Sequence, residues 1–119
     1  MSEIHSYRDL AVWQRSVDIA IEIYGMTGTF PRSEEYGLAS QMRRATVSIP
    51  SNIAEGRARP GKEFGRFLGI VLGSLAELET QLEIARRLSY LSEENYPHVT
   101  GELDIIGKQI RRLLQRVRN

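Results

Sequence analysis

The stretch KEFGRFLGIVLGSLAELETQLEIARRLSY, residues 62–90, decides the fold class of this chain. Its apolar side chains recur at intervals of three and four residues; they are Phe64, Phe67 or Leu68, Val71, Leu75, Leu78, Leu82, Ala85 and Leu88. That spacing puts them on one face of an α-helix, whereas a half-buried strand would alternate strictly between apolar and polar residues. The stretch therefore predicts one long amphipathic helix.

The residues that follow predict a further amphipathic helix from Ser92 onward. Ser92 is the predicted N-cap, two glutamates follow it, and the last turns are rich in arginine, so both ends suit the helix dipole. The apolar positions again step by threes and fours; they are Tyr96, Val99, Leu103, Ile106, Ile110, Leu113 and Val117. So regular a seam is typical of antiparallel helix bundles.

Two more helices are predicted before residue 62. The first runs from about Tyr7 to Met26. Its main apolar stripe is Leu10, Trp13, Val17, Ala20 or Ile21, and Tyr24, and a second set, Val12, Ile19 and Ile23, widens the face. So wide a face indicates burial on more than one side, inside a bundle or against another subunit. The next helix runs from an N-cap at Ser33 to Glu55, with Pro50 bending it, and residues 56–61 form a loop.

The composition fits one small folded domain. The chain has 119 residues, 41% of them hydrophobic and 26% charged, which is an ordinary globular mix with room for one core. We therefore predict a single domain, residues 1–119, with an all-α fold: four helices in an up-down-up-down antiparallel bundle. The sequence has no Cys, no apolar stretch of membrane-spanning length and no secretory signal, so we expect a cytoplasmic protein that contacts no membrane.

Residues that catalysis or metal binding would need are scarce. His5 and His98 are the two histidines, and neither belongs to the Glu-x-x-His pairs that di-iron bundles use. Residues 56–62, GRARPGK, follow the phosphate-binding loop pattern up to its last position, where Glu63 replaces the required Ser or Thr. We predict a non-enzymatic protein with no catalytic residue, no metal and no cofactor.

A short polar row lies beside the apolar stripe of the second predicted helix. Ser48, Asn52 and Glu55 are four and three residues apart, so they share one helix face. Near a proline they can satisfy a freed backbone carbonyl or bind a neighbouring helix. The alternative interpretation is a site for a ligand or a partner.

Arginine is concentrated in two parts of a chain whose net charge is only +1. The candidate nucleic-acid-binding residues are Arg43, Arg44, Arg57, Arg59, Lys62 and Arg66 in the first part, and Lys108, Arg111, Arg112 and Arg116 in the second. Guanidinium groups bind phosphate bidentately, so these clusters predict contact with RNA or DNA. The alternative is a solvated surface of salt bridges and helix-end charges.

Several short motifs resemble one protein family. They are Trp13-Gln14, Phe30-Pro31, residues 35–38 (EYGL), Gln41 with Arg43-Arg44, residues 48–56 (SIPSNIAEG), and Gly73-Ser74-Leu75 with Glu77-Leu78. Together they closely resemble the four-helix bundle proteins encoded in intervening sequences of bacterial 23S ribosomal RNA genes. The resemblance covers nearly the whole chain and implies no enzymatic activity, because the family has none established.

Related bundles include the accessory variability proteins of diversity-generating retroelements, which form pentameric rings and work with a reverse transcriptase and its RNA. The resemblance therefore implies a homopentamer here, and it marks Arg43, Arg44 and residues 52–59 as positions to test. Two functions follow as hypotheses. One is an oligomeric adaptor that binds RNA or DNA through its arginines. The other is a protein-interaction scaffold without a nucleic-acid role, such as a reverse-transcriptase partner.

Overall fold

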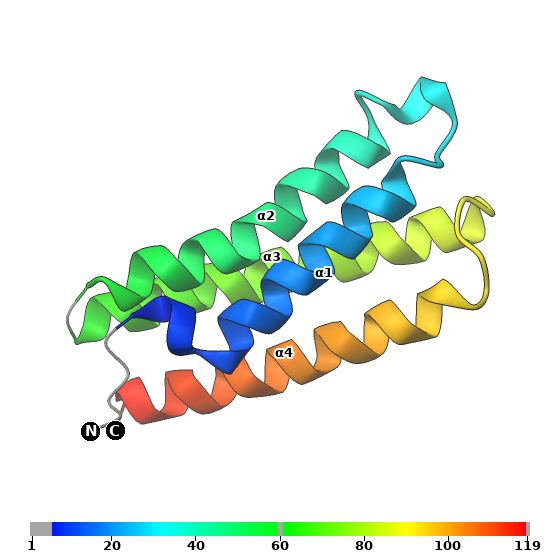
Figure 1. Ribbon diagram of the computed structural model, residues 1–119. Coiled ribbons are helices and arrows are strands. Elements are labelled where there is room, and N and C mark those ends of the chain that lie inside the picture. Colours follow the sequence, from blue (N-terminus) through cyan, green and yellow to red (C-terminus); the bar gives the residue numbers. More distant parts are fainter. Residues whose placement is uncertain (1–5, 60, 119) are drawn as a thin grey trace.

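The computed structural model describes residues 6–59 and 61–118, and within them the chain forms four long helices and no strand. They are α1 (Ala11–Thr27), α2 (Leu38–Arg57), α3 (Lys62–Arg87) and α4 (Asn95–Arg118), with short 3-10 turns η1 (Tyr7–Asp9) and η2 (Arg32–Glu34). The helices run alternately up and down (Figure 1). The predicted all-α four-helix bundle is confirmed.

The helices form an elongated bundle of 47 × 23 × 20 Å. Helix α2 packs against both α1 and α3, and α3 packs against α4, whereas α1 and α4 contact each other less extensively. Because the directions alternate, the start of α1, the α2–α3 connection and the end of α4 all lie at one end of the bundle (Figure 1). That arrangement positions the charged side chains described below.

Every helix contributes fully buried side chains to one core. Its largest members are Ile19, Ile23, Met42, Ile49, Ile53, Leu68, Val71, Leu78, Leu82, Leu103, Ile106 and Ile110. From the predicted stripes they include Leu68, Val71, Leu78 and Leu82 on α3, and Leu103, Ile106 and Ile110 on α4. Burial of each such side chain favours folding by about 1.5–3 kcal/mol relative to exposure.

On α1, the sequence prediction put the wrong residues at the centre of the buried face. Tyr24, assigned to the main stripe, is 46% exposed, and Ile21, given there as the alternative to Ala20, is 68% exposed. The buried face instead follows Val12, Ser16, Ile19, Ile23 and Thr27. Two members of this face are polar, and each hydroxyl donates to a carbonyl of its own helix, Ser16 to Trp13 at 2.8 Å and Thr27 to Ile23 at 2.7 Å. Polar residues satisfied in this way are hidden from a hydrophobic pattern.

Helix α2 begins later than predicted. Ser33 is not its N-cap: it lies in η2, and α2 starts at Leu38 after Gly37. The cap is supplied by Glu34, whose Oε1 accepts a hydrogen bond from the backbone N–H of Leu38 at 3.0 Å. A carboxylate near the first amides of a helix satisfies an otherwise orphan donor and suits the helix dipole.

The other helix ends differ only locally from the prediction. Leu10 is extended (φ −80°, ψ 123°), so η1 is separated from α1 and the helix begins at Ala11. Helix α3 ends at Arg87, just before Ser89 with its positive φ of 63°. Ser92 acts near the start of α4 as predicted, because its Oγ accepts from the N–H of Asn95 at 3.3 Å.

Candidate nucleic-acid interface

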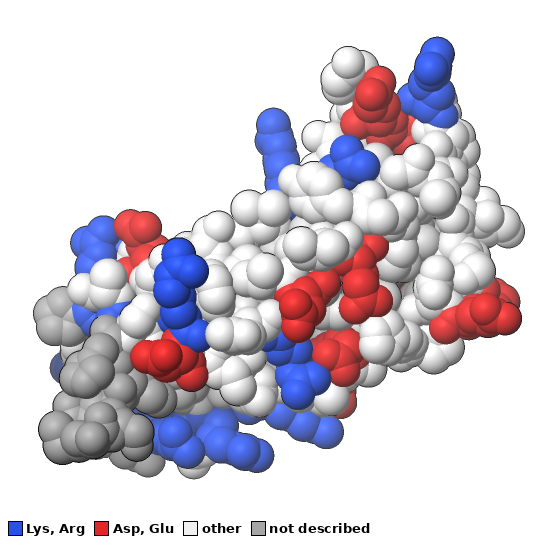
Figure 2. Space-filling view, viewed as in Figure 1, with Lys and Arg blue, Asp and Glu red and all other residues white. Residues whose placement is uncertain are grey.

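Apart from Arg43 and Arg44, the two arginine-rich parts of the sequence meet at one end of the bundle. The exposed and half-exposed cations of this surface, called the basic end below, are Arg57, Arg59, Lys62, Arg66, Arg111, Arg112, Arg116 and Arg118. They come from the end of α2, the start of α3 and the end of α4, which the alternating helix directions bring together (Figure 1). Figure 2 shows Lys and Arg side chains along the lower edge, over the second half of α4.

Direct packing between α3 and α4 joins the two clusters. A Cβ built on Gly65 would lie 3.4 Å from Cγ1 of Val117 and 3.6 Å from Cδ1 of Leu114. The first turn of α3 therefore lies against the last turns of α4. Lys62 and Arg66 belong to this first part of α3, so they lie at the same end of the bundle as the α4 arginines.

On the α2–α3 side of the basic end, the arginines form weak local pairs. Arg59 binds Glu55 at 3.0 Å and Arg66 binds Glu63 at 3.2 Å, and all four side chains are about half exposed. Both guanidinium groups also face the ring of Phe67, at 5.6 and 4.8 Å from its centroid. Exposed ion pairs of this kind contribute little to stability, so a phosphate can replace the carboxylate at low cost.

On the α4 side, no carboxylate of the described residues pairs with the arginines. Arg111, Arg112, Arg116 and Arg118 are exposed, and within residues 6–59 and 61–118 no ion pair or hydrogen bond engages their guanidinium groups. Lys108 differs, because it pairs with Asp104 one turn earlier, at 3.3 Å. The last three turns of α4 therefore present unneutralised positive charge.

Arg43 and Arg44 do not belong to the basic end. They lie in the first half of α2, toward the opposite end of the bundle. The Nε of Arg43 donates to Oγ1 of Thr27 at 2.9 Å, and its guanidinium lies 4.8 Å from the centroid of the Tyr24 ring. Arg43 therefore fastens α2 to the end of α1, whereas Arg44 is exposed.

Residues 8–112 match the family described as 23S rRNA-intervening sequence protein. The chain belongs to this family. Among solved structures, it is similar to a protein with unknown function from the S23 ribosomal protein family of Bacteroides thetaiotaomicron, with a TM-score of 0.78 and 25% sequence identity. That similarity covers 87% of this chain and 98% of the other. No curated protein matches the chain.

In this protein, Ser48 of the polar row on α2 contacts α3, and Asn52 bonds to Ser48. Oγ of Ser48 and Oγ of Ser74 on α3 are 2.8 Å apart, and Nδ2 of Asn52 donates to both the carbonyl and the Oγ of Ser48, at 2.8 and 2.9 Å. Glu55 does not join them, because it pairs with Arg59. These contacts favour the structural interpretation of Ser48 and Asn52. Ser74 belongs to the Gly73-Ser74-Leu75 motif, but the sequence did not predict this contact, because nothing in the motif shows that its hydroxyl faces Ser48 on another helix.

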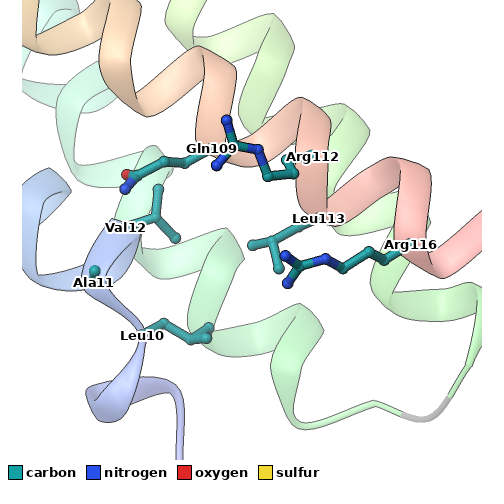
Figure 3. Close-up of a pocket in the computed structure, with 7 residues that line it drawn as sticks. All are labelled: Leu10, Ala11, Val12, Gln109, Arg112, Leu113 and Arg116. Atoms are coloured by element: carbon teal, nitrogen blue, oxygen red, sulfur yellow. The ribbon is translucent and has the colours of Figure 1, made fainter.

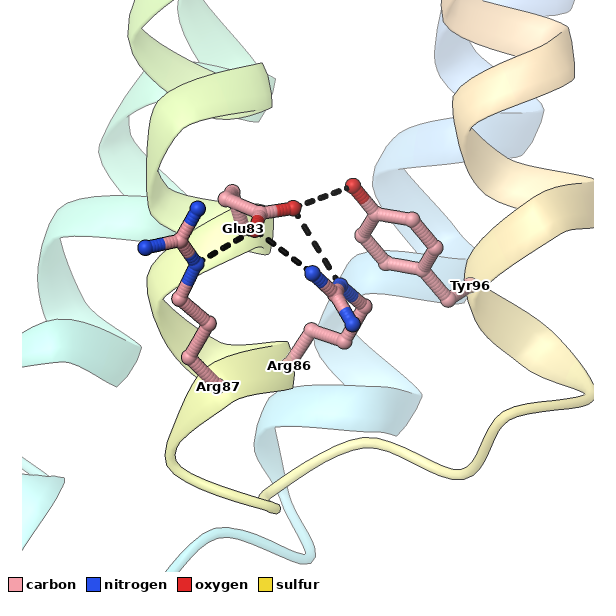
Figure 4. A network of polar contacts seen from close by, with 4 residues as sticks. All are labelled: Glu83, Arg86, Arg87 and Tyr96. Atoms are coloured by element: carbon pink, nitrogen blue, oxygen red, sulfur yellow. Dashed lines mark hydrogen bonds and ion pairs between the residues drawn. The ribbon is translucent and has the colours of Figure 1, made fainter.

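Away from the basic end, a cluster of Glu83, Arg86, Arg87 and Tyr96 joins α3 to α4 (Figure 4). The carboxylate of Glu83 accepts from Arg86 at 2.7 and 3.2 Å, from Nε of Arg87 at 2.6 Å and from the hydroxyl of Tyr96 at 2.8 Å. These bonds lower the pKa of Glu83 to about 2 from an ordinary value of 4.5. The bond to Glu83 in turn raises the pKa of Tyr96.

This cluster predicts an acid-sensitive contribution to stability. Because the pKa of Glu83 is lower in the folded than in the unfolded chain, its contribution is complete above pH 4.5 and is lost as the pH falls toward 2. We expect Glu83→Gln to remove this part of the decline in melting temperature between pH 5 and pH 2, as followed by circular dichroism. Glu79→Gln, an exposed carboxylate one turn earlier, is the control. Parallel acid profiles for wild type and Glu83→Gln would contradict the assignment.

None of the described helices is long and apolar enough to cross a membrane. Residues 6–59 and 61–118 also contain no group of three His, Asp or Glu side chains that could hold a metal ion. His98 pairs with Glu22 across the α1–α4 seam at 3.1 Å, and His5 lies outside the described residues.

Proposed function

We propose that this protein is a non-enzymatic, cytoplasmic RNA-binding adaptor whose basic end contacts the phosphate backbone. The observation that carries the proposal is the convergence of two sequence-distant arginine clusters on one end of the bundle. The α4 arginines supply charge that no other described residue pairs with, and Arg59 and Arg66 exchange weak carboxylate partners for phosphate. Membership of a family linked to 23S rRNA intervening sequences supports RNA as the nucleic acid.

The contacts of the basic end favour recognition of backbone shape rather than base sequence. Phe67, the aromatic ring flanked by Arg59 and Arg66, is only 7% exposed, so bases cannot stack on it. Guanidinium groups fork onto phosphate oxygens, and such contacts position a protein on RNA without reading bases. A structured RNA that brings several phosphates close together is therefore the expected ligand.

The proposal is tested with a fluorescein-labelled RNA hairpin in anisotropy titrations at about 50 and 200 mM salt. Affinity is expected to fall steeply with salt, because each phosphate contact releases counterions. The variant Arg66→Gln/Arg111→Gln should lower affinity about 10- to 100-fold and flatten the salt slope by about 1–2. Its melting temperature should stay close to wild type, since both side chains are exposed.

Arg32→Gln/Arg44→Gln is the matched control. It removes the same charge from exposed side chains outside the basic end, so affinity should change by less than about threefold. Equal losses in the two double variants would show that net charge alone attracts RNA. Negligible binding at both salt concentrations would refute the proposal.

A second candidate function, a protein-interaction scaffold, is favoured by apolar side chains left uncovered on α1 and α2. Ile21, Tyr24 and Val47 are 68%, 46% and 42% exposed. The Arg43 guanidinium stacks on the ring of Tyr24, and Arg43 lies one turn before Val47 on α2. The apolar side chains of α1 and of α2 therefore lie on neighbouring faces of the two helices. A closed ring buries two different patches of each subunit, and the proposed homopentamer would cover this one. A stoichiometric protein partner that survives nuclease treatment would instead support a scaffold for other proteins, such as a reverse transcriptase.

The proposed contact between subunits can be tested by placing a charge in it. Ile21→Lys should lower the mass measured by light scattering from that of an oligomer to that of a single chain, because a charge in an apolar contact is costly to desolvate. Ile84→Lys is the control: Ile84 is 45% exposed on α3, a helix that does not pack against α1. A single-chain mass for the wild type would contradict the ring.

A further inference from the structure

A cleft lies between the start of α1 and the last turns of α4 (Figure 3), which pack against each other less extensively than the other contacting pairs of long helices. Its volume is about 200 Å³, and its lining residues are Leu10, Ala11, Val12, Gln109, Arg112, Leu113 and Arg116. Gln109 and Arg116 extend from α4 toward α1, with Leu113 between them (Figure 3). The cleft thus combines an aliphatic floor with polar groups from a single helix face.

The aliphatic floor fits one small apolar group. Leu10, Val12 and Leu113 supply it, and the lining residues that the structure describes include no aromatic ring. A cavity of roughly 150 Å³ in another protein accommodates benzene, so one of this size holds a branched aliphatic side chain. Sites for larger ligands span about 300–1,000 Å³, and base-binding surfaces rely on aromatic stacking. Both comparisons disfavour a nucleotide.

The polar groups of the cleft are complementary to a ligand that carries a carboxylate next to an N–H donor. Arg112 and Arg116 are one helical turn apart. Among the described residues, no acidic side chain lines the cleft and no partner engages either guanidinium. Oε1 of Gln109 is buried, and no donor of residues 6–59 or 61–118 bonds to it. A buried acceptor without a donor is costly, and a ligand N–H would satisfy it.

We propose that this cleft binds the C-terminal residue of a peptide whose last side chain is aliphatic. The terminal carboxylate binds Arg112 and Arg116, the backbone N–H donates to Gln109, and the side chain occupies the floor formed by Leu10, Val12 and Leu113. In the C-terminal residue of a peptide, the carboxylate, the backbone N–H and the side chain are all attached to the same Cα atom. The proposal does not depend on RNA binding.

The test uses a fluorescein-labelled hexapeptide that ends in leucine, titrated with the full chain. We expect saturable binding that weakens at least about tenfold when the peptide is C-terminally amidated, because amidation removes the charge that the guanidinium groups bind. Arg112→Gln/Arg116→Gln should abolish the difference between the two peptides. Gln109→Met, which keeps the length and removes the acceptor, should weaken the acid peptide severalfold.

Arg111→Gln/Arg118→Gln separates this site from general charge. It removes two arginines of the same helix that do not line the cleft, so peptide binding should stay within about twofold of wild type. Equal affinity for acid and amide peptides, or equal losses in both arginine pairs, would overturn the proposal. So would a 5′-phosphorylated dinucleotide that binds more tightly than the peptide and depends on Arg112 and Arg116. RNA binding that fails while peptide binding persists leaves the proposal standing.

Discussion

Replacing Ile106 by alanine is expected to lower the free energy of unfolding by about 2–5 kcal/mol. Ile106 is fully buried in α4, within the single core that all four helices share. Truncation there removes buried methyl groups and leaves a cavity, because packed helices relax only partly. Since small domains are stable by about 5–15 kcal/mol in total, this one change consumes a large fraction of the stability.

Ile105, the residue before Ile106, provides the control for this prediction. Ile105 is 38% exposed, and Ile105→Ala makes the same chemical change in the same helix, so the effect on helix propensity is shared. We expect a loss of about 1 kcal/mol or less there. Urea unfolding followed by circular dichroism measures both. Similar losses at the two positions would show that the buried face of α4 is assigned wrongly.

Replacing Gly56 by alanine should also destabilise the protein, by about 1–3 kcal/mol. A Cβ at Gly56 would lie 2.5 Å from Cβ of Phe67 and 3.0 Å from Cδ1 of Phe64. The closer atom is attached directly to the α3 backbone, so a rotamer change cannot relieve the clash. Helices α2 and α3 must move apart, and the packing around Phe67 is lost.

Gly73→Ala is the matched substitution with the opposite expected sign. Gly73 lies inside α3, and nothing lies within 4 Å of a Cβ built there. Alanine should therefore stabilise the helix by about 0.5–1 kcal/mol through its higher helix propensity. Thermal or urea unfolding of both variants is the measurement. Stabilisation by Gly56→Ala would contradict the close approach of α2 and α3.

The four helices could be predicted because each carries a stripe that repeats every three or four residues. The prediction went wrong where local polar chemistry replaces that pattern. Ser16 and Thr27 are buried because their hydroxyls bond to their own helix, and hydrophobicity does not show this. The start of α2 was missed because Glu34, four residues before the first amide it caps, acts from within a 3-10 turn.

The basic end was predictable only in part. Alternating helix directions place the end of α2 and the end of α4 together, so the residues alone identify most of its arginines. They do not show that Arg43 binds Thr27, because that contact joins two helices across 16 residues of sequence. Tyr96 was likewise assigned only to the apolar seam, although its hydroxyl completes the Glu83 cluster.

The start of α1 and the end of α4 lie beside the basic end, and this affects how the protein can be handled (Figure 1). An affinity tag or a fluorescent fusion on either side of residues 6–118 would project next to the arginines and obstruct or mimic their charge. Exposed connections accept insertions best. The connection between α1 and α2, where Tyr36 is 90% exposed, is therefore the better place for a label or a surface-immobilisation site.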